Sequence, residues 1–307
     1  MRRLILVTGA PRSATTPVGN VLAACKSTVA LYEPLGPTGL SWIDTPFPIA
    51  GDALGITRDD LQRLVQELAS LSFGPLKSQV RVGHEPTLVS RLFGSRTLHS
   101  MRLSRFQPWA ANVIWKDPHA VLLASDLIEL GVAVVVTARR ALAHAASYKR
   151  LGWHSKAAEV YPRWSARFGP CSICETFLPR STDHVVSAAL LWRMSYLPLV
   201  RAGSLNKVRL ITSADLEANE KAAYLKLIRD LALTPGRRVD WMLSRTQRGS
   251  SADPTSRRVH DWTRSVATVN SYWRQLLTEE DIDTVEQITS DLETRLFDRS
   301  RSCQNAG

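Results

Sequence analysis

The sequence predicts an α/β protein of three layers, in which a central parallel sheet of about five strands is flanked by helices. Short aliphatic segments alternate along the chain with amphipathic helical patterns, as in repeated strand-helix-strand units. Such units join parallel strands through right-handed crossovers. The chain has 307 residues, of which 44% are hydrophobic and 22% charged, a composition typical of a globular protein. We expect a single domain over residues 1–296 and a disordered tail over residues 297–307.

Five segments are predicted to form the sheet because each is short, apolar and bounded by polar or turn-forming residues. They are Leu4–Val7, Thr28–Tyr32, Ala110–Trp115, Val132–Ala138 and Lys207–Thr212. The fourth is almost wholly aliphatic, which favours a central position with both faces buried.

Helices are predicted where apolar residues recur at the helical period. They span Thr15–Ala24, Thr57–Leu71, Pro118–Leu130, Ala141–Lys149, Val185–Val200, Ala218–Leu233, Ser265–Leu277 and a last segment from Thr278. Thr57 with Asp60, and Thr278 with Asp281, have the spacing of capping boxes. We expect irregular structure over residues 34–56, 151–182 and 244–258, and a basic connection that includes Arg81, Arg91, Arg96, Arg102 and Arg105.

The first strand leads into Gly9–Thr16, with the sequence GAPRSATT, and then into a helix. Backbone N–H groups at such a helix start bind anions, so we expect a phosphate-binding loop and a P-loop-type fold. A magnesium triphosphate loop would have Gly-Lys-Ser/Thr where this chain has Ala14, Thr15 and Thr16. Arg12 supplies the cation instead, and a guanidinium can bind two phosphate oxygens without a metal. A solvated turn without a ligand is the alternative.

Charged side chains follow four of the predicted strands. Arg12 follows the first, Glu33 the second, Lys116 the third and Arg139 the fourth. The carboxyl ends of parallel strands form the ligand side of an open sheet, so these groups are expected to share one crevice. Pro34 predicts an extended backbone at Glu33.

These motifs resemble those of the sulfotransferases that use 3′-phosphoadenosine 5′-phosphosulfate (PAPS), and the likeness extends over residues 4–296. The loop is similar to their 5′-phosphosulfate loop, G-x-P-R-S-G-T-T, and residues 134–147 resemble their 3′-phosphate segment, with Arg139 and Ser147 at the matching positions. Shorter likenesses are Tyr32–Leu35, Asp215-Leu216 and Tyr272–Arg274 with the residues after it.

The resemblance implies sulfuryl transfer from PAPS to an acceptor hydroxyl, without a metal. Pro11, Arg12, Ser13, Ala14, Thr15 and Thr16 would bind the 5′-phosphosulfate, and Arg139 and Ser147 the 3′-phosphate. Arg257 and Arg258 are further candidates for the 3′-phosphate, as is Arg264. Glu33 would act as the base, with His119 or Asp117 as alternatives, and Lys116 would help Arg12 to stabilise the leaving group.

Two positions depart from the family pattern. Ala14 stands where the family has glycine, which requires a negative φ at this residue. Arg140 stands where the family usually has aspartate, and we expect it to add to the basic field of the site.

The net charge of +11 favours anionic partners. Because the basic residues are scattered, an anionic donor is expected rather than nucleic acid. No apolar run reaches the length of a membrane span, which predicts a soluble, cytoplasmic protein. Four cysteines are too few for a disulfide framework. Cys171 and Cys174, flanked by His154 and His184, leave open a zinc knuckle, a redox-sensitive pair or a plain turn.

Tyr32–Leu35, which contains the pair Glu33-Pro34, resembles an element of the carbohydrate sulfotransferases, and this likeness favours a glycan or another small glycoconjugate as acceptor. Trp42, Trp153 and Trp164 are suited to contact such a ligand. Two other classes stay open at this point. A metal-dependent small-molecule kinase would use a similar loop with a lysine and a magnesium-binding carboxylate. A non-catalytic binder of nucleotides or nucleic acid would use the same positive charge without Glu33.

Overall fold

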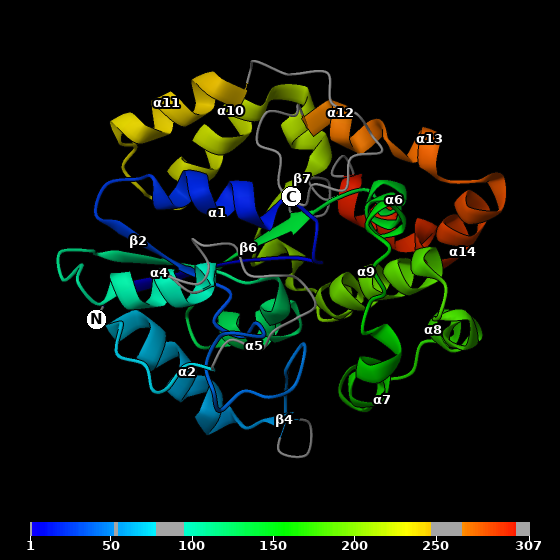
Figure 1. Ribbon diagram of the computed structural model, residues 1–307, viewed down its shortest axis with the longest axis horizontal. Helices are drawn as coiled ribbons and strands as arrows, with labels where there is room; N and C mark the ends of the chain where they lie inside the picture. Colours follow the sequence, from blue (N-terminus) through cyan, green and yellow to red (C-terminus); the bar gives the residue numbers. More distant parts are fainter. Residues whose placement is uncertain (1, 52–54, 78–94, 247–265, 299–307) are drawn as a thin grey trace, which may run out of the picture.

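A five-stranded parallel sheet lies at the centre of the molecule (Figure 1). The computed structural model describes residues 2–51, 55–77, 95–246 and 266–298. The sheet order is β2-β5-β1-β6-β7. These strands are β1 (Arg3–Thr8), β2 (Thr28–Tyr32), β5 (Asn112–Lys116), β6 (Ala133–Ala138) and β7 (Arg209–Thr212). All neighbouring pairs are parallel, which confirms the predicted fold class.

Helices cover both faces of the sheet and give it two cores. Along β1, Leu4 and Leu6 point into one core, and Ile5 and Val7 into the other. This alternation follows from the two-residue period of a strand. On one face lie α1 (Thr15–Ala23), α10 (Ser213–Asp230) and α11 (Arg237–Thr246), and on the other α2 (Arg58–Ser70) and α5 (Ala124–Glu129) (Figure 1). The protein therefore has the predicted three layers.

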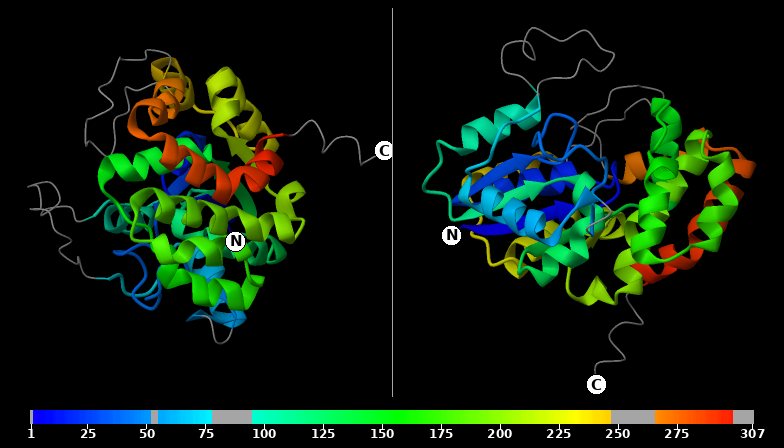
Figure 2. Two further views of the ribbon diagram at one scale, coloured as in Figure 1. Left: turned by 90° about the vertical axis from the view of Figure 1, so that its right-hand side faces the viewer. Right: turned by 90° about the horizontal axis from the view of Figure 1, so that it is seen from below.

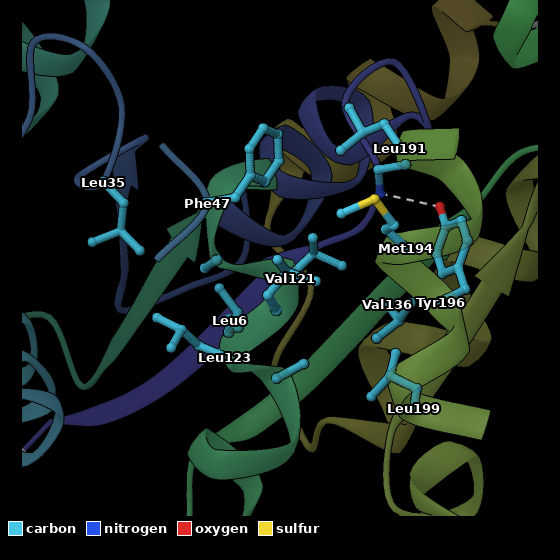
Figure 3. Close-up of a cluster of buried hydrophobic side chains, with 14 of the residues drawn as sticks. Leu6, Leu35, Phe47, Val121, Leu123, Val136, Leu191, Met194, Tyr196 and Leu199 are labelled. Atoms are coloured by element: carbon cyan, nitrogen blue, oxygen red, sulfur yellow. Dashed lines mark hydrogen bonds between the residues drawn. The ribbon is translucent and has the colours of Figure 1, made fainter. Parts of the chain in front are cut away.

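Helix α9 (His184–Arg201) runs through the larger core and is buried on all sides from Val185 to Leu199. An apolar surface all round a helix is typical of a helix enclosed by protein. Its side chains meet those of β1 and β6 in the cluster of Figure 3, where Leu191, Met194, Tyr196 and Leu199 lie near Leu6 and Val136. Among the described residues no helix is long and apolar enough to cross a membrane.

A group of helices packs beside the carboxyl end of the sheet, around α9 (Figure 2). It consists of α6 (Ala141–Leu151), α7 (Ala157–Phe168), α8 (Ser172–Phe177), α12 (Val266–Ser271), α13 (Trp273–Leu276) and α14 (Glu279–Phe297). Two ion pairs join α14 to the region of α6. Lys149 pairs with Asp281 at 2.5 Å, and Arg140, at the N-cap of α6, with Glu293 at 3.0 Å.

The prediction of irregular structure over residues 151–182 is wrong, because α7 and α8 occupy most of this segment. The three prolines of this segment favoured irregular structure, yet one of them, Pro162, lies inside α7. Trp164 of α7 is completely buried and donates its indole N–H to the carbonyl of Met194 at 2.9 Å. Burial of this side chain against α9 outweighs the hydrogen bond that the proline lacks.

Other boundaries also differ from the prediction. The basic connection contains α4 (Arg96–Ser104), whose Met101 is buried in the core next to β2. The helix predicted over Pro118–Leu130 is a 3₁₀ turn (Pro118–Leu123) followed by α5, and the one over Ser265–Leu277 is divided into α12 and α13. Residues 34–56 are mostly irregular but include β3 (Ile49–Ala50) and β4 (Gly55–Ile56). Helix α11 extends to Thr246, into the predicted polar loop.

Both predicted capping boxes are confirmed, at Thr57 with Asp60 and at Thr278 with Asp281. Helix α14 continues to Phe297, which packs against the core although the predicted tail begins there. Residues 299–307 lie outside the described residues, as do Arg81 and Arg91.

The stability of the helix group should depend on pH through His144 of α6. This side chain is fully buried, and burial, followed by the charges of Arg139 and Arg12, lowers its pKa to about 3. In the unfolded chain the pKa is about 6.5. Below that pH the unfolded state binds a proton that the folded state does not bind. The free energy of unfolding therefore falls by up to about 1.4 kcal/mol per pH unit until the folded pKa is reached.

We therefore expect His144→Leu to gain stability relative to the wild type as the pH falls from 7 to 5, measured by urea unfolding at each pH. His99→Gln, which changes an exposed histidine of α4, is the control and should follow the wild type. Equal pH dependence in wild type and His144→Leu would contradict burial of a neutral histidine.

Candidate active site

The predicted phosphate loop connects β1 to α1 and lies against β6. Gly9 has φ +149°, and a Cβ atom there would lie 2.2 Å from the carbonyl oxygen of Thr137. Only glycine can occupy this position, because any side chain would collide with the backbone of β6. The loop is thereby held close to the end of β6, where Arg139 follows.

The backbone of the loop has the conformation of an anion-binding nest. Arg12 and Ala14 have φ values of +72° and +69°, with Ser13 between them at a φ that is not positive. Such alternation is typical of nests that bind anions, although the N–H of Ser13 donates to the Ala10 carbonyl at 3.1 Å. Ala14 is the N-cap of α1 without a side-chain capping bond, and the first turn of α1 has no acidic residue. The start of α1 therefore presents a positive helix end to a bound anion.

The expectation of a negative φ at Ala14 is wrong. The residue lies in the left-handed region although its Cβ makes that conformation unfavourable. The surrounding contacts of the loop hold it there, and backbone strain of this kind is common at ligand-binding sites.

Tyr196 of α9 fixes the position of the loop through hydrogen bonds. Its hydroxyl accepts the N–H of Ala10 at 3.1 Å (Figure 3), and it lies 3.1 Å from the Ser13 hydroxyl and 2.8 Å from the Thr137 carbonyl oxygen. The ring is fully buried and burial raises the pKa of the phenol, so the group stays neutral and keeps its proton. Sequence reasoning missed Tyr196 because it lies in an apolar helix far along the chain.

Arg12 contacts Ser147 and lies near Arg139. The Arg12 Nε donates to Ser147 Oγ at 3.2 Å, and its guanidinium lies 5.8 Å from the centre of the Trp153 ring. Arg139 is buried and donates to Asn270 Oδ1 at 2.7 Å and to the Val269 carbonyl at 2.6 Å. The two guanidinium groups are close enough to repel each other.

The electrostatics of this cluster favour an anion. Burial, and then the charge of Arg150, lower the pKa of Arg12 to about 10. Burial, Arg12 and Arg150 lower the pKa of Arg139 to about 9, with Glu217 opposing. Both arginines stay protonated at neutral pH, but the lowered values mean that nearby negative charge only partly compensates the cost of burying them. Arg150 was missed, although it follows Ser147 by three residues on the same helix face.

Glu33 and Lys116 form a second group, on the β2 and β5 side of the loop. Their side chains make an ion pair, and the Glu33 N–H donates to the Lys116 carbonyl at 2.7 Å. Lys116 is almost completely buried, whereas about a third of the Glu33 side chain is exposed. Gly19 of α1 leaves room for Lys116, because a Cβ there would lie 2.9 Å from the lysine Cγ. The lysine therefore positions the carboxylate where solvent and ligands reach it.

The extended backbone predicted for Glu33 is wrong, since its φ is +49°. The strand has already ended at Tyr32, and the chain turns into a bend closed by the bond from the Gly36 N–H to the Glu33 carbonyl at 2.9 Å. Glycine is required at Gly39, because a Cβ there would lie 1.8 Å from the Pro34 carbonyl oxygen.

Asp117 has a structural role as the N-cap of the 3₁₀ turn Pro118–Leu123. It is fully buried and accepts the N–H groups of Leu35 and His119 at 2.7 and 3.0 Å. Burial is the main cause of its raised pKa. The carboxylate joins the turn after Glu33 to the end of β5. The ring of His119 packs against that of Phe47, with ring centres 5.1 Å apart and the planes tilted by 50°.

The remaining candidates divide as follows. Pro11 and Thr16 are partly exposed, and Ser13 and Thr15 are buried at the base of the loop. Arg257, Arg258 and Arg264 lie outside the described residues. Arg140 does not add to the basic field as predicted, because Glu293 neutralises it and it stacks on Phe297.

The two central cysteines face Arg193 and not the histidines. Cys171 Sγ accepts the N–H of Cys174 and Nε of Arg193, both at 3.4 Å, whereas His154 and His184 stack on each other. The contact with Cys174, and the charge of Arg193, lower the pKa of Cys171 to about 5. Within the described ranges, no three His, Cys, Asp or Glu side chains are grouped to hold a metal ion.

A cavity of about 760 Å³ adjoins the arginine cluster through Asn270. Glu217, Glu286 and Glu293 line it together with Arg140 and Arg274. These three carboxylates and that of Asp298 make the cavity a poor phosphate site, so the candidate site is the loop and the arginine cluster and not the cavity.

Comparison of the sequence with known family models gives no match, and comparison with curated proteins gives none. The chemistry of the site is therefore interpreted from its geometry and from the motifs of the sequence.

Strain at Ala14 predicts that Ala14→Gly stabilises the protein. Glycine removes the left-handed penalty of about 1 kcal/mol and gives back part of it through the greater freedom of the unfolded chain. We expect a gain of about 0.5 kcal/mol in the free energy of unfolding, measured by denaturant titration. Ala23→Gly in the same helix is the control and should lose about 1 kcal/mol. A similar loss for both variants would contradict the left-handed loop.

Proposed function

We propose that the protein is a sulfotransferase that transfers a sulfuryl group from PAPS to an acceptor hydroxyl. The observation that supports this most strongly is the pairing of two anion-binding features at the carboxyl end of the sheet. One is the nest at Gly9–Thr16, and the other is the cluster of Arg139, Ser147 and Arg12 beside it. A donor with phosphate groups at both the 5′ and the 3′ position has one anionic group for the loop and one for the arginine cluster.

The loop would bind the 5′-phosphosulfate. Its N–H groups, the start of α1 and the Arg12 guanidinium stabilise negative charge on the phosphate oxygens, with the hydroxyls of Thr15 and Thr16 nearby in sequence. Arg139 and Ser147 would bind the 3′-phosphate. The absence of lysine from the loop disfavours the alternative of a magnesium-dependent kinase.

Transfer would proceed in line, through a loose transition state like that of phosphoryl transfer. The acceptor oxygen forms a bond to sulfur while the bond from sulfur to the bridging oxygen of the phosphate breaks. The electron pair of the broken bond stays on that bridging oxygen, where Arg12 and the loop stabilise it. Lys116, on the neighbouring strand, would help Arg12 to stabilise this charge.

Glu33 would accept the proton of the acceptor hydroxyl. It is a partly exposed carboxylate at this edge of the sheet, and its ion pair with Lys116 fixes its orientation. His119 is the rival base, but its ring packs against Phe47. Asp117 is fully buried and fully used as a backbone acceptor, which disfavours it.

The acceptor class follows only from the motif resemblance, which favours a glycan or another small glycoconjugate. Trp153 is the tryptophan best placed to contact a ligand, since it is 40% exposed beside Arg12. Trp164 is completely buried in the core and is excluded from that role. A cytoplasmic location remains part of the proposal.

Adenosine 3′,5′-bisphosphate is expected to raise the melting temperature, whereas ATP with magnesium should not. At about 100 times its dissociation constant a ligand stabilises the folded state by about 2.7 kcal/mol, or roughly 5 °C for a chain of this size. Arg12→Ala and Arg139→Ala should each abolish the shift. The readout is the ligand-induced shift, so a lower starting stability of either variant does not affect it.

Arg180→Ala, which removes an arginine paired with Glu280 on the surface, is the matched control and should retain the full shift. Adenosine 5′-phosphate should stabilise less than the bisphosphate, because it lacks the group that Arg139 and Ser147 bind. Stabilisation by ATP with magnesium alone would support the kinase alternative and contradict the proposal.

Glu33→Gln should retain binding of the bisphosphate and lose turnover by a factor of about 100 to 10,000, as expected on removal of a general base. Transfer is measured with sulfur-labelled PAPS and a panel of mono- and disaccharides. His119→Gln should keep both the binding of the bisphosphate and the turnover. Full turnover in Glu33→Gln with loss in His119→Gln would assign the base to His119.

A further inference from the structure

Three large apolar side chains are exposed close together at the end of α4. Leu103, Phe106 and Trp109 expose 46%, 75% and 70% of their surface. We call these three residues the α4 patch. Single exposed apolar residues are common, but two aromatic rings and a leucine within seven residues are a feature of interaction surfaces.

The local backbone brings these side chains to one place. The N–H of Phe106 donates to the Leu103 carbonyl at 3.1 Å, and that of Ala110 to the Gln107 carbonyl at 3.2 Å. These turns keep the segment compact, so the three residues lie within a short length of exposed chain. The segment projects at the edge of the molecule beside the N-terminus in Figure 1.

Positive charge surrounds the patch. Residues 95–112 contain three arginines and no aspartate or glutamate. Arg102 and Arg105 are exposed between the apolar residues. Arg2 reaches the same edge, because it donates to the carbonyls of Ser70 and Pro108 at 3.0 and 3.4 Å. Aromatic and aliphatic groups interleaved with arginine match the interface of an anionic bilayer, where rings enter the headgroup layer and cations meet lipid phosphates.

We propose that the α4 patch docks the protein on an anionic lipid surface. A second copy of the chain fits the patch less well, because a two-fold contact would bring the same arginines face to face. The net charge of +11 also draws the molecule toward a negative surface before contact.

Docking through this patch leaves the candidate active site open to solvent. The patch precedes β5 and so lies at the amino end of the parallel strands, whereas the phosphate loop and Glu33 lie at the carboxyl end. The proposal is therefore independent of the sulfotransferase assignment, and either can fail without the other.

Co-sedimentation with vesicles tests it. The full chain should bind vesicles of equal parts phosphatidylcholine and phosphatidylglycerol at low salt, bind pure phosphatidylcholine weakly, and lose affinity as sodium chloride is added. Phe106→Ser with Trp109→Ser should lower the partition coefficient about tenfold or more. Arg102→Glu should lower it through charge alone.

The matched control is Trp241→Ser, which removes a tryptophan of α11 that is 55% exposed and leaves the α4 patch intact. It should bind like the wild type. All substituted residues are exposed, and unchanged melting temperatures will verify folding. Equal vesicle binding by the wild type and the double variant would overturn the proposal. The proposal would also be overturned if neither the wild type nor the double variant bound vesicles, while the wild type formed a dimer or a complex with single-stranded RNA that the double variant did not form.

Discussion

The hydroxyl of Tyr196 is the point at which the candidate site is attached to the core. It lies in the most buried helix of the protein and contacts the Ala10 N–H, the Ser13 hydroxyl and the Thr137 carbonyl. If the tyrosine hydroxyl were removed, each of these groups would lose a hydrogen bond that water could not easily replace at such a depth. The strained backbone of the loop, with its left-handed Arg12 and Ala14, is maintained by this contact and by the close approach of Gly9 to β6. A rigid loop of this kind presents its N–H groups without reorganisation, as electrostatic stabilisation of a transition state requires.

The second constraint is electrostatic. The half-buried Arg12 lies near the buried Arg139. Burial lowers the pKa of both, followed by the charge of Arg150 for Arg12 and by the charges of Arg12 and Arg150 for Arg139. The helix that carries Ser147 and Arg150 is fixed from behind by α14, through the Lys149 to Asp281 pair. In turn α14 is tied to α9 by Arg193, whose guanidinium binds both carboxylate oxygens of Asp291 at 2.6 and 3.0 Å. The two arginines are thus held in place by packing, by the bonds from Arg139 to Asn270 and Val269, and by ion pairs elsewhere.

The sequence predicts the sheet and both capping boxes, because these depend on local patterns and on the common direction of parallel strands. It does not predict α7, since the stabilising contact of Trp164 is with a helix thirty residues away in sequence. The backbone conformations of Ala14 and Glu33 were wrong for a related reason. Residue preferences describe an isolated chain, whereas the core and the neighbouring strands impose left-handed conformations at these two positions. Tyr196 was missed because nothing in an apolar helix distinguishes a tyrosine that supports a loop from one that only fills space.

The central claim is that one ligand with two phosphate groups bridges the loop and the arginine cluster. A crystal structure of the chain with adenosine 3′,5′-bisphosphate tests this most directly. The account predicts the 5′-phosphate against the backbone of Gly9–Thr16 and the 3′-phosphate against Arg139 and Ser147, with Glu33 facing the 5′ side. A nucleotide bound elsewhere, or one whose 3′-phosphate makes no contact with Arg139 or Ser147, would contradict it.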